Sequence, residues 1–290
     1  MKYKIDNAVI LAAGTASRFA PLSYEHPKSL ITVKGEVLIE RQIKQLREAG
    51  IDEIIIVTGY QKEKFEYLID KYNLILLEND SYLTRNNNAS IYCAQKYLHN
   101  TYICSSDNYF TKNPFEKEAD GSYYCSLFSE GETNEWCFGI DNEDNIKKIT
   151  IGGRNTWYML GYAFWDENFS KKFIKILNQV YNNPETYNLY WEDILIQHLS
   201  ELNIKIKRCP SDLIFEFDTI DELREFDSEY INNTHSSILK KAARELNCEE
   251  KDIVNILSYR SKDNAASGFT FDVLDKSYRY DYEKEIIELI

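Results

Sequence analysis

The stretch Ile10–Leu30, ILAAGTASRFAPLSYEHPKSL, decides how the rest of the chain is interpreted. It begins at the end of an apolar run of strand length and continues into the small residues 12–14, as a loop after a buried first strand does. Small side chains let a ligand approach the backbone, and Gly14 can adopt the positive φ that a sharp turn needs. Arg18 then offers a planar fork of donors for phosphate oxygens, and Lys28 offers a point charge. The stretch predicts a strand-to-loop edge that binds a nucleoside triphosphate.

Pro21 and Pro27 restrict the conformation of the segment between the two cations. The loop lacks the Gly-Lys-Ser/Thr ending of a P-loop and the three glycines of a dinucleotide fingerprint, which excludes both of those nucleotide sites. The simpler alternative is a strand-to-loop connection with two incidental cations.

Four features of this loop resemble the signature of the sugar-phosphate and choline-phosphate nucleotidyltransferases. They are Leu-Ala-Ala-Gly at 11–14, Arg18, Pro21-Leu22 and Pro27-Lys28, and the chain departs from the family at Ala16, where glycine is usual. The resemblance implies catalytic roles for Arg18 and Lys28. It also implies a nucleotide site that includes Leu11, Ala12, Ala13 and Gly14.

The length of 290 residues predicts one large domain, or one large and one small domain. A net charge of −13 argues against non-specific binding to nucleic acid or to an anionic membrane. A phosphorylated substrate therefore has to be met by local cations. Six cysteines without a Cys-x-x-Cys pair predict reduced thiols, and the absence of a signal-peptide pattern or an apolar run of membrane-spanning length predicts a cytoplasmic protein.

Helical and strand patterns alternate after the first loop. Apolar spacing predicts helices at 37–49 and 65–72, and apolar runs predict strands at 54–57 and 74–77. This alternation implies parallel strands with right-handed crossovers, so ligands are expected at the carboxyl ends of the strands. Tyr60 lies at such an end.

Polar residues follow at two further places. Asn88 precedes a predicted helix at 89–98, where it can cap the helix, and the family resemblance implies that this region contacts the nucleobase. Ser106 and Asp107 follow a predicted strand at 102–104. An aspartate in such a turn is usually only a turn former. The resemblance and its place beside the nucleotide loop instead predict that Asp107 holds a divalent cation on triphosphate oxygens.

The middle of the chain, residues 122–165, is typical of short strands joined by hairpins, with predicted strands at 123–130, 135–141, 146–151 and 157–165. Predicted helices at 167–181 and 191–202 follow, then an exposed or edge strand at 204–206. A further alternating strand at 213–218 places Glu216 and Asp218 on one face. A helix at 219–231 completes the predicted domain, residues 1–232.

Within the family, the chain most resembles bacterial CTP:phosphocholine cytidylyltransferases. Segments 133–136, 164–166, 189–193 and 216–218 carry this likeness, which covers about residues 5–230. It implies transfer of cytidylyl from CTP to phosphocholine with Mg²⁺ on Asp107 and Asp218, and a three-layer α/β fold with a mixed, mostly parallel sheet. The implied acceptor residues are Trp136, Tyr190, Trp191, Glu192, Asp193 and Glu216, although Trp191 can belong to the core and Glu192 can simply favour a helix start.

Several other functions stay open at this point. The acceptor can be phosphoethanolamine, an aminoalkylphosphonate or a sugar 1-phosphate, and a nucleotide sensor without turnover would bind CTP alone. A glycosyltransferase of related fold would lack the loop from Arg18 to Lys28. The expected partners are CTP and a small phosphorylated amine, without nucleic acid, in a protein that can form homo-oligomers.

Residues 233–290 form a predicted small α+β appendage, with helices at 236–246 and 249–257 and a strand at 268–274. The order of these elements faintly resembles the beginning of a choline-kinase-like domain. We expect no kinase activity, because no kinase catalytic motif occurs in the sequence. The simpler interpretation is a structural appendage that packs on the transferase or forms an oligomer contact.

Overall fold

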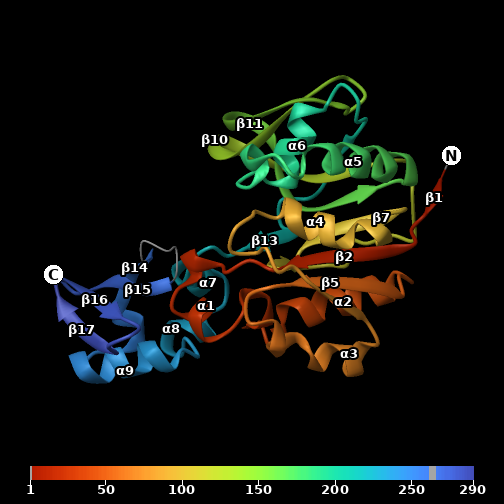
Figure 1. Ribbon diagram of the computed structural model, residues 1–290. Coiled ribbons are helices and arrows are strands. Elements are labelled where there is room, and N and C mark those ends of the chain that lie inside the picture. Colours follow the sequence, from red (N-terminus) through yellow and green to blue (C-terminus); the bar gives the residue numbers. More distant parts are fainter. Residues whose placement is uncertain (1, 261–265) are drawn as a thin grey trace. The chain divides into compact units, whose positions relative to one another are not determined.

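A computed structural model describes residues 2–260 and 266–290 (Figure 1). The chain divides into two compact units, one formed by residues 1–14 and 39–215 and the other by residues 15–38 and 216–290. In the second unit, the Arg224 guanidinium donates hydrogen bonds at 2.7 Å to the carbonyls of Glu250 and Ile253, so residues before 232 pack with the C-terminal segment.

The first unit is built on a seven-stranded sheet in the order β12-β10-β11-β7-β2-β5-β6. Strands β6, β5, β2 and β7 are parallel, β11 runs antiparallel to β7 and β10, and β12 is the edge strand that we predicted. The mixed, mostly parallel sheet is therefore confirmed. Its strands are β2 (Asn7–Ala12), β5 (Glu53–Thr58), β6 (Ile75–Glu78), β7 (Thr101–Ser105), β10 (Tyr123–Ile140), β11 (Ile146–Trp165) and β12 (Lys205–Arg208).

Helices cover both faces of this sheet, which gives the three layers (Figure 1). The chain moves outward from β2 to β6 and then returns to β7, so right-handed crossovers put α2 and α3 on one face and α4 on the other. Side chains of α4, α5 and α6 pack with Val9, Ile55, Val57 and Ile103 in one apolar core. The helices are α2 (Leu38–Glu48), α3 (Tyr67–Tyr72), α4 (Asn88–Ala94), α5 (Glu167–Val180) and α6 (Trp191–Gln197), with 3₁₀ turns at Lys62–Phe65, Gln95–Tyr97 and Pro184–Thr186.

The hairpin of β10 and β11 corrects the four short strands that we predicted. The two strands run 18 and 20 residues and pair antiparallel, with register shifts along their length. One shift lies between Ser129 and Glu132, where Gly131 has a φ of 88°. The turn predicted from the Asp and Asn residues at 141–145 joins the two strands, whereas Gly131, Gly152 and Asn155 lie within continuous strands, where their positive φ angles accompany bulges and bends.

Two short strand pairs form separate two-stranded sheets. They are β1 (Tyr3–Lys4) with β9 (Glu118–Ala119), and β8 (Asn108–Phe110) with β13 (Ile214–Glu216).

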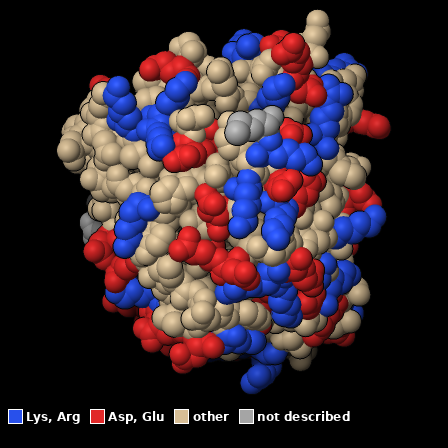
Figure 2. Space-filling model, turned by 90° about the vertical axis from the view of Figure 1, so that its right-hand side faces the viewer, with Lys and Arg blue, Asp and Glu red and all other residues tan. Residues whose placement is uncertain are grey.

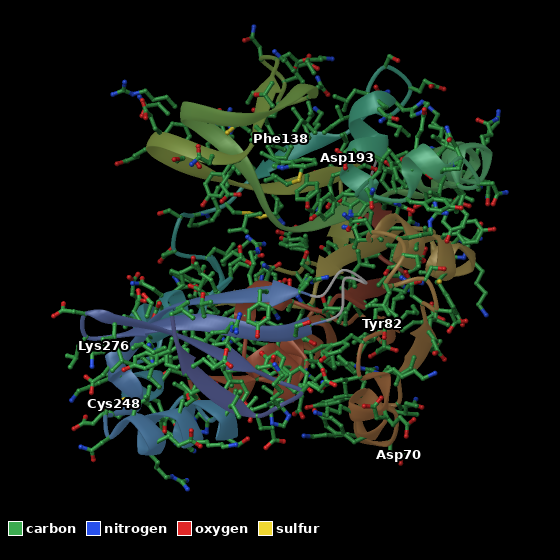
Figure 3. All side chains as sticks on the ribbon, turned by 60° about the vertical axis from the view of Figure 1, so that its left-hand side comes forward. Asp70, Tyr82, Phe138, Asp193, Cys248 and Lys276 are labelled. Atoms are coloured by element: carbon green, nitrogen blue, oxygen red, sulfur yellow. A yellow bond between two sulfur atoms is a disulfide. The ribbon has the colours of Figure 1, made fainter. Side chains whose placement is uncertain are left out.

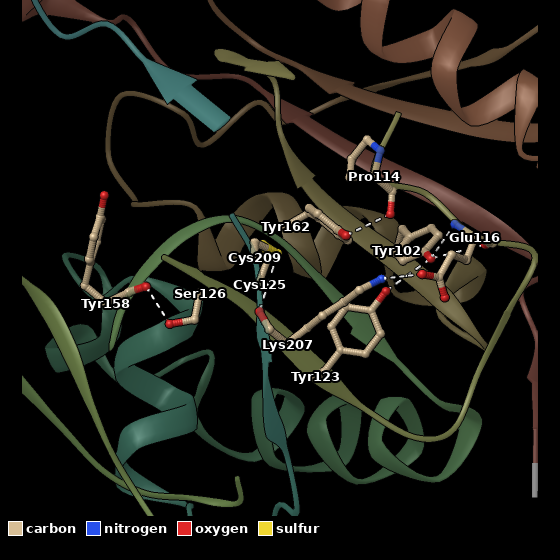
Figure 4. The surroundings of a disulfide bond; sticks show 10 residues. All are labelled: Tyr102, Pro114, Glu116, Tyr123, Cys125, Ser126, Tyr158, Tyr162, Lys207 and Cys209. Atoms are coloured by element: carbon tan, nitrogen blue, oxygen red, sulfur yellow. Dashed lines mark hydrogen bonds and ion pairs between the residues drawn. A yellow bond between two sulfur atoms is a disulfide. The ribbon is translucent and has the colours of Figure 1, made fainter. Parts of the chain in front are cut away.

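A disulfide joins Cys125 and Cys209 in the first unit, where we predicted only reduced thiols (Figure 4). The sulfurs meet because β10 and β12 are parallel neighbours in which Cys125 pairs with Lys207, and because the N–H of Cys209 donates to the carbonyl of Ser126 at 2.9 Å. The two residues are 84 apart in sequence, so their spacing carried no sign of the bond. Cys93, Cys104, Cys137 and Cys248 are free thiols.

The second unit joins the loop after β2 to the C-terminal segment. Its N-terminal part contains 3₁₀ turns at Ser17–Phe19 (η1) and Lys28–Leu30, α1 (Leu22–Glu25), and the strand pair β3 (Thr32–Val33) and β4 (Glu36–Val37). Its C-terminal part contains a four-stranded antiparallel sheet in the order β14-β15-β16-β17. The elements are α7 (Ile220–Phe226), α8 (Glu229–Asn232), α9 (Ser237–Leu246), β14 (Ile253–Arg260), β15 (Ala266–Val273), β16 (Lys276–Asp281) and β17 (Ile286–Leu289).

Two predicted helices of this unit need correction. The helix predicted at 219–231 is two helices, α7 and α8. The helix predicted at 249–257 is wrong, because only a 3₁₀ turn at Glu250–Asp252 precedes strand β14. The buried residues Ile253 and Ile256 are three apart because a register shift interrupts β14 between Val254 and Leu257, where Asn255 has a φ of 54°. A bulge therefore imitated helical spacing.

No helix in residues 2–260 or 266–290 is long and apolar enough to cross a membrane. Figure 2 shows acidic and basic side chains interspersed over the face it presents, in keeping with a charged composition spread over the surface.

Candidate functional site

The nucleotide loop leaves β2 beside the end of β5, as the parallel order predicts. Ala12 and Ala13 are buried, and the N–H of Tyr60 donates to the carbonyl of Ala13 at 3.2 Å. Gly59 has no space for a side chain, since a Cβ there would lie 3.0 Å from that carbonyl oxygen and 2.8 Å from Tyr82. The ends of β2 and β5 thus form a close-packed pair of turns.

Ala16 occupies the one position where the loop departs from the family sequence. Its φ of 44° and ψ of 45° lie in the left-handed region, immediately before η1. We expected Gly14 to have the positive φ of this loop. Ala16 has it instead, and Gly14 lies outside the left-handed region. A Cβ at Gly14 would meet nothing within 4 Å.

Substituting Ala16→Gly should therefore stabilise the chain. Left-handed backbone costs a residue with a Cβ roughly 1–2 kcal/mol. Replacing alanine by glycine removes this cost, but the greater conformational freedom of glycine in the unfolded chain offsets about 0.5–1 kcal/mol of the stabilisation. We expect the free energy of unfolding to rise by about 0.5–1 kcal/mol in denaturant titrations, whereas Ala16→Val should lower it. A loss of stability in Ala16→Gly would show that the left-handed conformation carries no strain.

A cluster of two cations and one carboxylate lies in the second unit. The Arg18 guanidinium contacts the Asp218 carboxylate at 2.7 Å, and the Lys28 ammonium lies 3.5 Å from the other oxygen of that carboxylate. The Lys28 side chain is only 6% exposed, whereas that of Arg18 is 74% exposed. The structure therefore brings together both predicted catalytic cations and one of the two predicted metal ligands.

Local hydrogen bonds explain why Asp218 is held at this place. It follows β13 and immediately precedes Thr219, the N-cap of α7, whose hydroxyl accepts the N–H of Glu222. The Glu222 carboxylate in turn accepts the backbone N–H groups of Asp218, at 2.6 Å, and Thr219. Such a capping box fixes the chain at the start of a helix, and with it the direction from which Asp218 is presented.

The second predicted metal ligand, Asp107, belongs to the first unit. Asp107 and Ser106 form the half-buried turn between β7 and β8, and the carbonyl of the preceding Ser105 accepts a hydrogen bond from Gln42 at 3.0 Å. Carboxylate oxygens are the ligands that Mg²⁺ prefers, and it is commonly bound by one or two of them together with substrate phosphates. The chemistry of Asp107 and Asp218 fits that pattern. In the described residues no three His, Cys, Asp or Glu side chains form a metal-binding group.

Asn88 does not cap α4, which is a correction of our capping hypothesis. It is the first residue of the helix, and its buried side chain donates to the carbonyls of Thr186, at 2.9 Å, and Leu189. The predicted contact with a nucleobase stays a prediction, although both amide hydrogens of Asn88 are already engaged. Its evident role is to hold the segment before α6.

The predicted acceptor residues divide into two groups. Trp136 of β10 and Tyr190 meet edge to face, with ring centroids 6.0 Å apart, and Tyr190 is 46% exposed. Trp191 is instead a core residue with 2% exposure that packs on Trp165 and Tyr124. Its predicted contact with substrate is therefore wrong, and the simpler interpretation of this tryptophan is confirmed.

Glu192 and Asp193 lie in the first turn of α6 and have different partners. Asp193, labelled in Figure 3, accepts the N–H of Tyr190 at 2.8 Å and caps the helix. The Glu192 carboxylate accepts hydrogen bonds from the Tyr124 hydroxyl at 3.2 Å and the Asn87 amide at 3.3 Å. Burial raises the pKa of Glu192 to about 7, and these two donors oppose the shift. Glu192 is thus a carboxylate that can gain or lose a proton near neutral pH.

Glu216, the remaining predicted acceptor residue, ends β13 and is exposed in the second unit. Its predicted role in binding the acceptor stays a prediction.

Residues that we did not predict connect these parts of the first unit. Asn87 accepts the N–H of Trp191 at 2.7 Å and donates to Glu192, so it positions the start of α6. Arg85 lies against the rings of Tyr181 and Tyr187 and donates to the carbonyl of Tyr181 at 2.7 Å. The run of three asparagines at 86–88 was the available signal, because side-chain amides often bond to backbone groups of loops.

Known proteins share both the sequence and the fold. The family description of the MobA-like NTP transferase domain matches residues 8–113. A choline-phosphate cytidylyltransferase of Streptococcus pneumoniae is 34% identical over 220 residues, which are 76% of this chain and 96% of that protein. A 2-aminoethylphosphonate cytidylyltransferase of Lancefieldella rimae is 35% identical over 229 residues, 78% of this chain and 93% of that protein.

A solved structure of CTP:phosphocholine cytidylyltransferase from Streptococcus pneumoniae has a TM-score of 0.75 and 33% identity to this chain, and the match covers 78% of this chain and 99% of that one. These matches confirm the nucleotidyltransferase fold. The protein is accordingly an enzyme of the nucleotidyltransferase class, and it belongs to the choline-phosphate cytidylyltransferase family.

Proposed function

We propose that the protein transfers a cytidylyl group from CTP to phosphocholine, giving CDP-choline and pyrophosphate. The observation that carries the choice of acceptor is the aromatic pair of the half-buried Trp136 and the exposed Tyr190, with the carboxylate of Glu192 two residues after Tyr190. Family membership supports the choice of reaction.

A quaternary ammonium group has no N–H to donate, so a protein can hold it only by aromatic faces and nearby carboxylates. Each contact of a cation with an aromatic face contributes roughly 0.5–2 kcal/mol. Trp136 and Tyr190 supply two rings from different elements, β10 and the start of α6. When ionised, Glu192 supplies the negative charge on the same helix turn.

The reaction forms one phosphorus–oxygen bond and breaks another. An oxygen of the phosphocholine phosphate attacks the α-phosphorus of CTP, and the bond from that phosphorus to the β-phosphate oxygen breaks as pyrophosphate leaves. The attacking group is already an anion, so no side chain has to remove a proton. Lys28 and Arg18 neutralise the charge that develops on the phosphate oxygens.

Mg²⁺ bound by Asp107 and Asp218 would supply further positive charge beside the triphosphate. Asp218 contacts both cations. We infer that nucleotide binding exchanges these ion pairs for contacts of Arg18 and Lys28 with phosphate. A cytoplasmic location and a homo-oligomeric state stay predictions.

Trp136→Ala and Tyr190→Ala test the acceptor site. Each variant should raise the KM for phosphocholine roughly 2- to 30-fold, the range of one cation–π contact, and leave the KM for CTP nearly unchanged. Trp157→Ala is the matched control, because Trp157 lies on the same hairpin but packs on Phe128. Equal effects of all three variants, or a shift of the CTP KM alone, would remove the proposed acceptor site.

The pKa of Glu192 predicts how acceptor binding depends on pH. With a pKa of about 7, most of the carboxyl is protonated at pH 6 and most is ionised at pH 8. Only the ionised form attracts the ammonium group, so the KM for phosphocholine should fall by up to about tenfold between these values. Steady-state kinetics of Glu192→Gln provide the control, since this variant retains the titration of the substrate phosphate. An identical pH profile in wild type and Glu192→Gln would contradict the role of Glu192.

An acceptor with a primary amine is the second candidate. The Lancefieldella rimae relative, named for 2-aminoethylphosphonate, is about as similar to this chain as the phosphocholine relatives are. A carboxylate such as Glu192 can also accept hydrogen bonds from an ammonium group with N–H donors. The two candidates differ in whether the aromatic pair or the carboxylate contributes more to binding.

A further inference from the structure

Residues that follow the predicted transferase domain contact the loop that carries Arg18 and Lys28. The Tyr282 ring, just after β16, stacks on Tyr24 of α1, with ring centroids 3.8 Å apart and planes within 6°. All of these residues belong to the second unit, whose C-terminal sheet and helix α9 are blue in Figure 1.

Two further contacts hold the same loop. The first residue of α9, Ser237, donates its backbone N–H at 2.7 Å and its hydroxyl to the carboxylate of Glu25. A carboxylate at the N-terminus of a helix is favoured by the unpaired N–H groups and the dipole there. At the end of β14, the Arg260 guanidinium donates to the hydroxyl of Thr15 at 3.1 Å, and β14 lies against η1, which carries Arg18.

In the sequence of the loop, these contacts lie on both sides of Arg18 and shortly before Lys28. Thr15 precedes Arg18, and Tyr24 and Glu25 stand between Arg18 and Lys28. A loop fixed at these points loses less conformational entropy when it binds a triphosphate, so binding is tighter. Its cations are also already oriented toward the phosphates, which favours charge stabilisation. The match to the pneumococcal structure covers 99% of that chain with only 78% of this one, so part of this chain has no counterpart there.

We propose that residues 236–260 and 266–290 act as a brace for the phosphate-binding loop, with Tyr282 and Ser237 as positioning residues for Arg18 and Lys28. This role rests on the proposed function, since it concerns the same loop. It differs from that of a purely structural appendage, which would contribute to stability without changing how the enzyme uses CTP.

The test compares two tyrosines of the C-terminal sheet in the full-length chain. Tyr282→Ala removes the ring that stacks on the loop. Tyr278→Ala removes a ring that stacks on Phe271 within the sheet, at 5.6 Å between centroids, and is the matched control. Tyr282→Phe retains the ring and should rescue the loss. For each variant we would measure kcat and the KM values for CTP and phosphocholine, the Tm, and the hydrogen–deuterium exchange of residues 15–30.

Tyr282→Ala should lower kcat/KM for CTP by about three- to tenfold, the worth of one aromatic pair, and leave the phosphocholine KM unchanged. Amides of residues 15–30 should exchange faster in this variant but not in Tyr278→Ala or Tyr282→Phe. Equal exchange and equal CTP kinetics in Tyr282→Ala and Tyr278→Ala would overturn the proposal.

Should Tyr282→Ala fail to fold, Glu25→Gln replaces it, because this change keeps the shape of the side chain and weakens the contact with Ser237. Faster exchange around residue 25 supports the brace, and unchanged exchange contradicts it. The exchange measurement needs no turnover. If the wild-type protein lacked cytidylyltransferase activity, the proposed function would be refuted. The exchange measurement would still test the brace.

Discussion

Lys28→Ala should lower kcat by about 10²- to 10³-fold, the usual effect of removing one preorganised charge from a developing anion. Lys28 is almost completely buried, and its ammonium group lies 3.5 Å from Asp218 and 5.8 Å from the centre of the Phe19 ring. A cation held in this way is already desolvated and oriented, so little reorganisation is needed when the phosphate charge appears. Pyrophosphate release under saturating CTP and phosphocholine measures the effect.

Lys34→Ala is the matched control for this substitution. Lys34 is an exposed cation in the same segment, and its ammonium group lies 5.1 Å from the centre of the Phe226 ring. This variant should retain wild-type turnover within about twofold, as exposed cations away from a site usually do. A loss in Lys28→Ala of less than about threefold, or an equal loss in both variants, would make Lys28 a structural residue rather than a catalytic one.

Asp218→Asn is expected to remove at least about 99% of turnover while the protein stays folded, because charge stabilisation at a metal site contributes several kcal/mol. Asparagine keeps the shape of the side chain but loses the charge that would bind Mg²⁺ and that pairs with Arg18 and Lys28. The same result is expected for Asp107→Asn, and a chelator should abolish wild-type turnover. Activity would be measured over a range of Mg²⁺ concentrations, with circular dichroism to confirm folding.

Asp212→Asn is the control here, since Asp212 is exposed and contributes its backbone carbonyl, not its carboxylate, to a hydrogen bond with Thr111. It should leave the Mg²⁺ dependence unchanged. Wild-type-like turnover in Asp218→Asn at saturating Mg²⁺ would refute the pair of metal ligands.

Much of the fold could be predicted because its strands carry strong local signals. The buried run that ends at Ala12 and the alternation that follows it predict parallel strands with their carboxyl ends at one edge, and Tyr60 and Ala13 meet there. Arg18 and Lys28 could be assigned to phosphate binding from the loop itself, but Asp218 could be assigned only through family resemblance, because 190 positions separate it from Lys28 in sequence. The structure shows that both cations contact the Asp218 carboxylate.

The errors have physical causes that the sequence does not display. Trp191 lies beside Tyr190 in sequence, but the first turn of α6 directs one ring into the core and leaves the other exposed. The bulge at Asn255 gave β14 the apolar spacing of a helix. Cys125 and Cys209 come together only because β10 and β12 are neighbours in the sheet, which is a property of topology and not of spacing.

The central claim is that phosphocholine is the acceptor, and one measurement tests it most directly. Pyrophosphate release would be followed with each of the four nucleoside triphosphates against phosphocholine, phosphoethanolamine, 2-aminoethylphosphonate and a sugar 1-phosphate. The proposed site predicts the highest kcat/KM for CTP with phosphocholine, since the paired rings of Trp136 and Tyr190 would contact the methyl groups that the primary amines lack. Equal or better turnover of a primary-amine acceptor would contradict the aromatic site for choline and favour the second candidate.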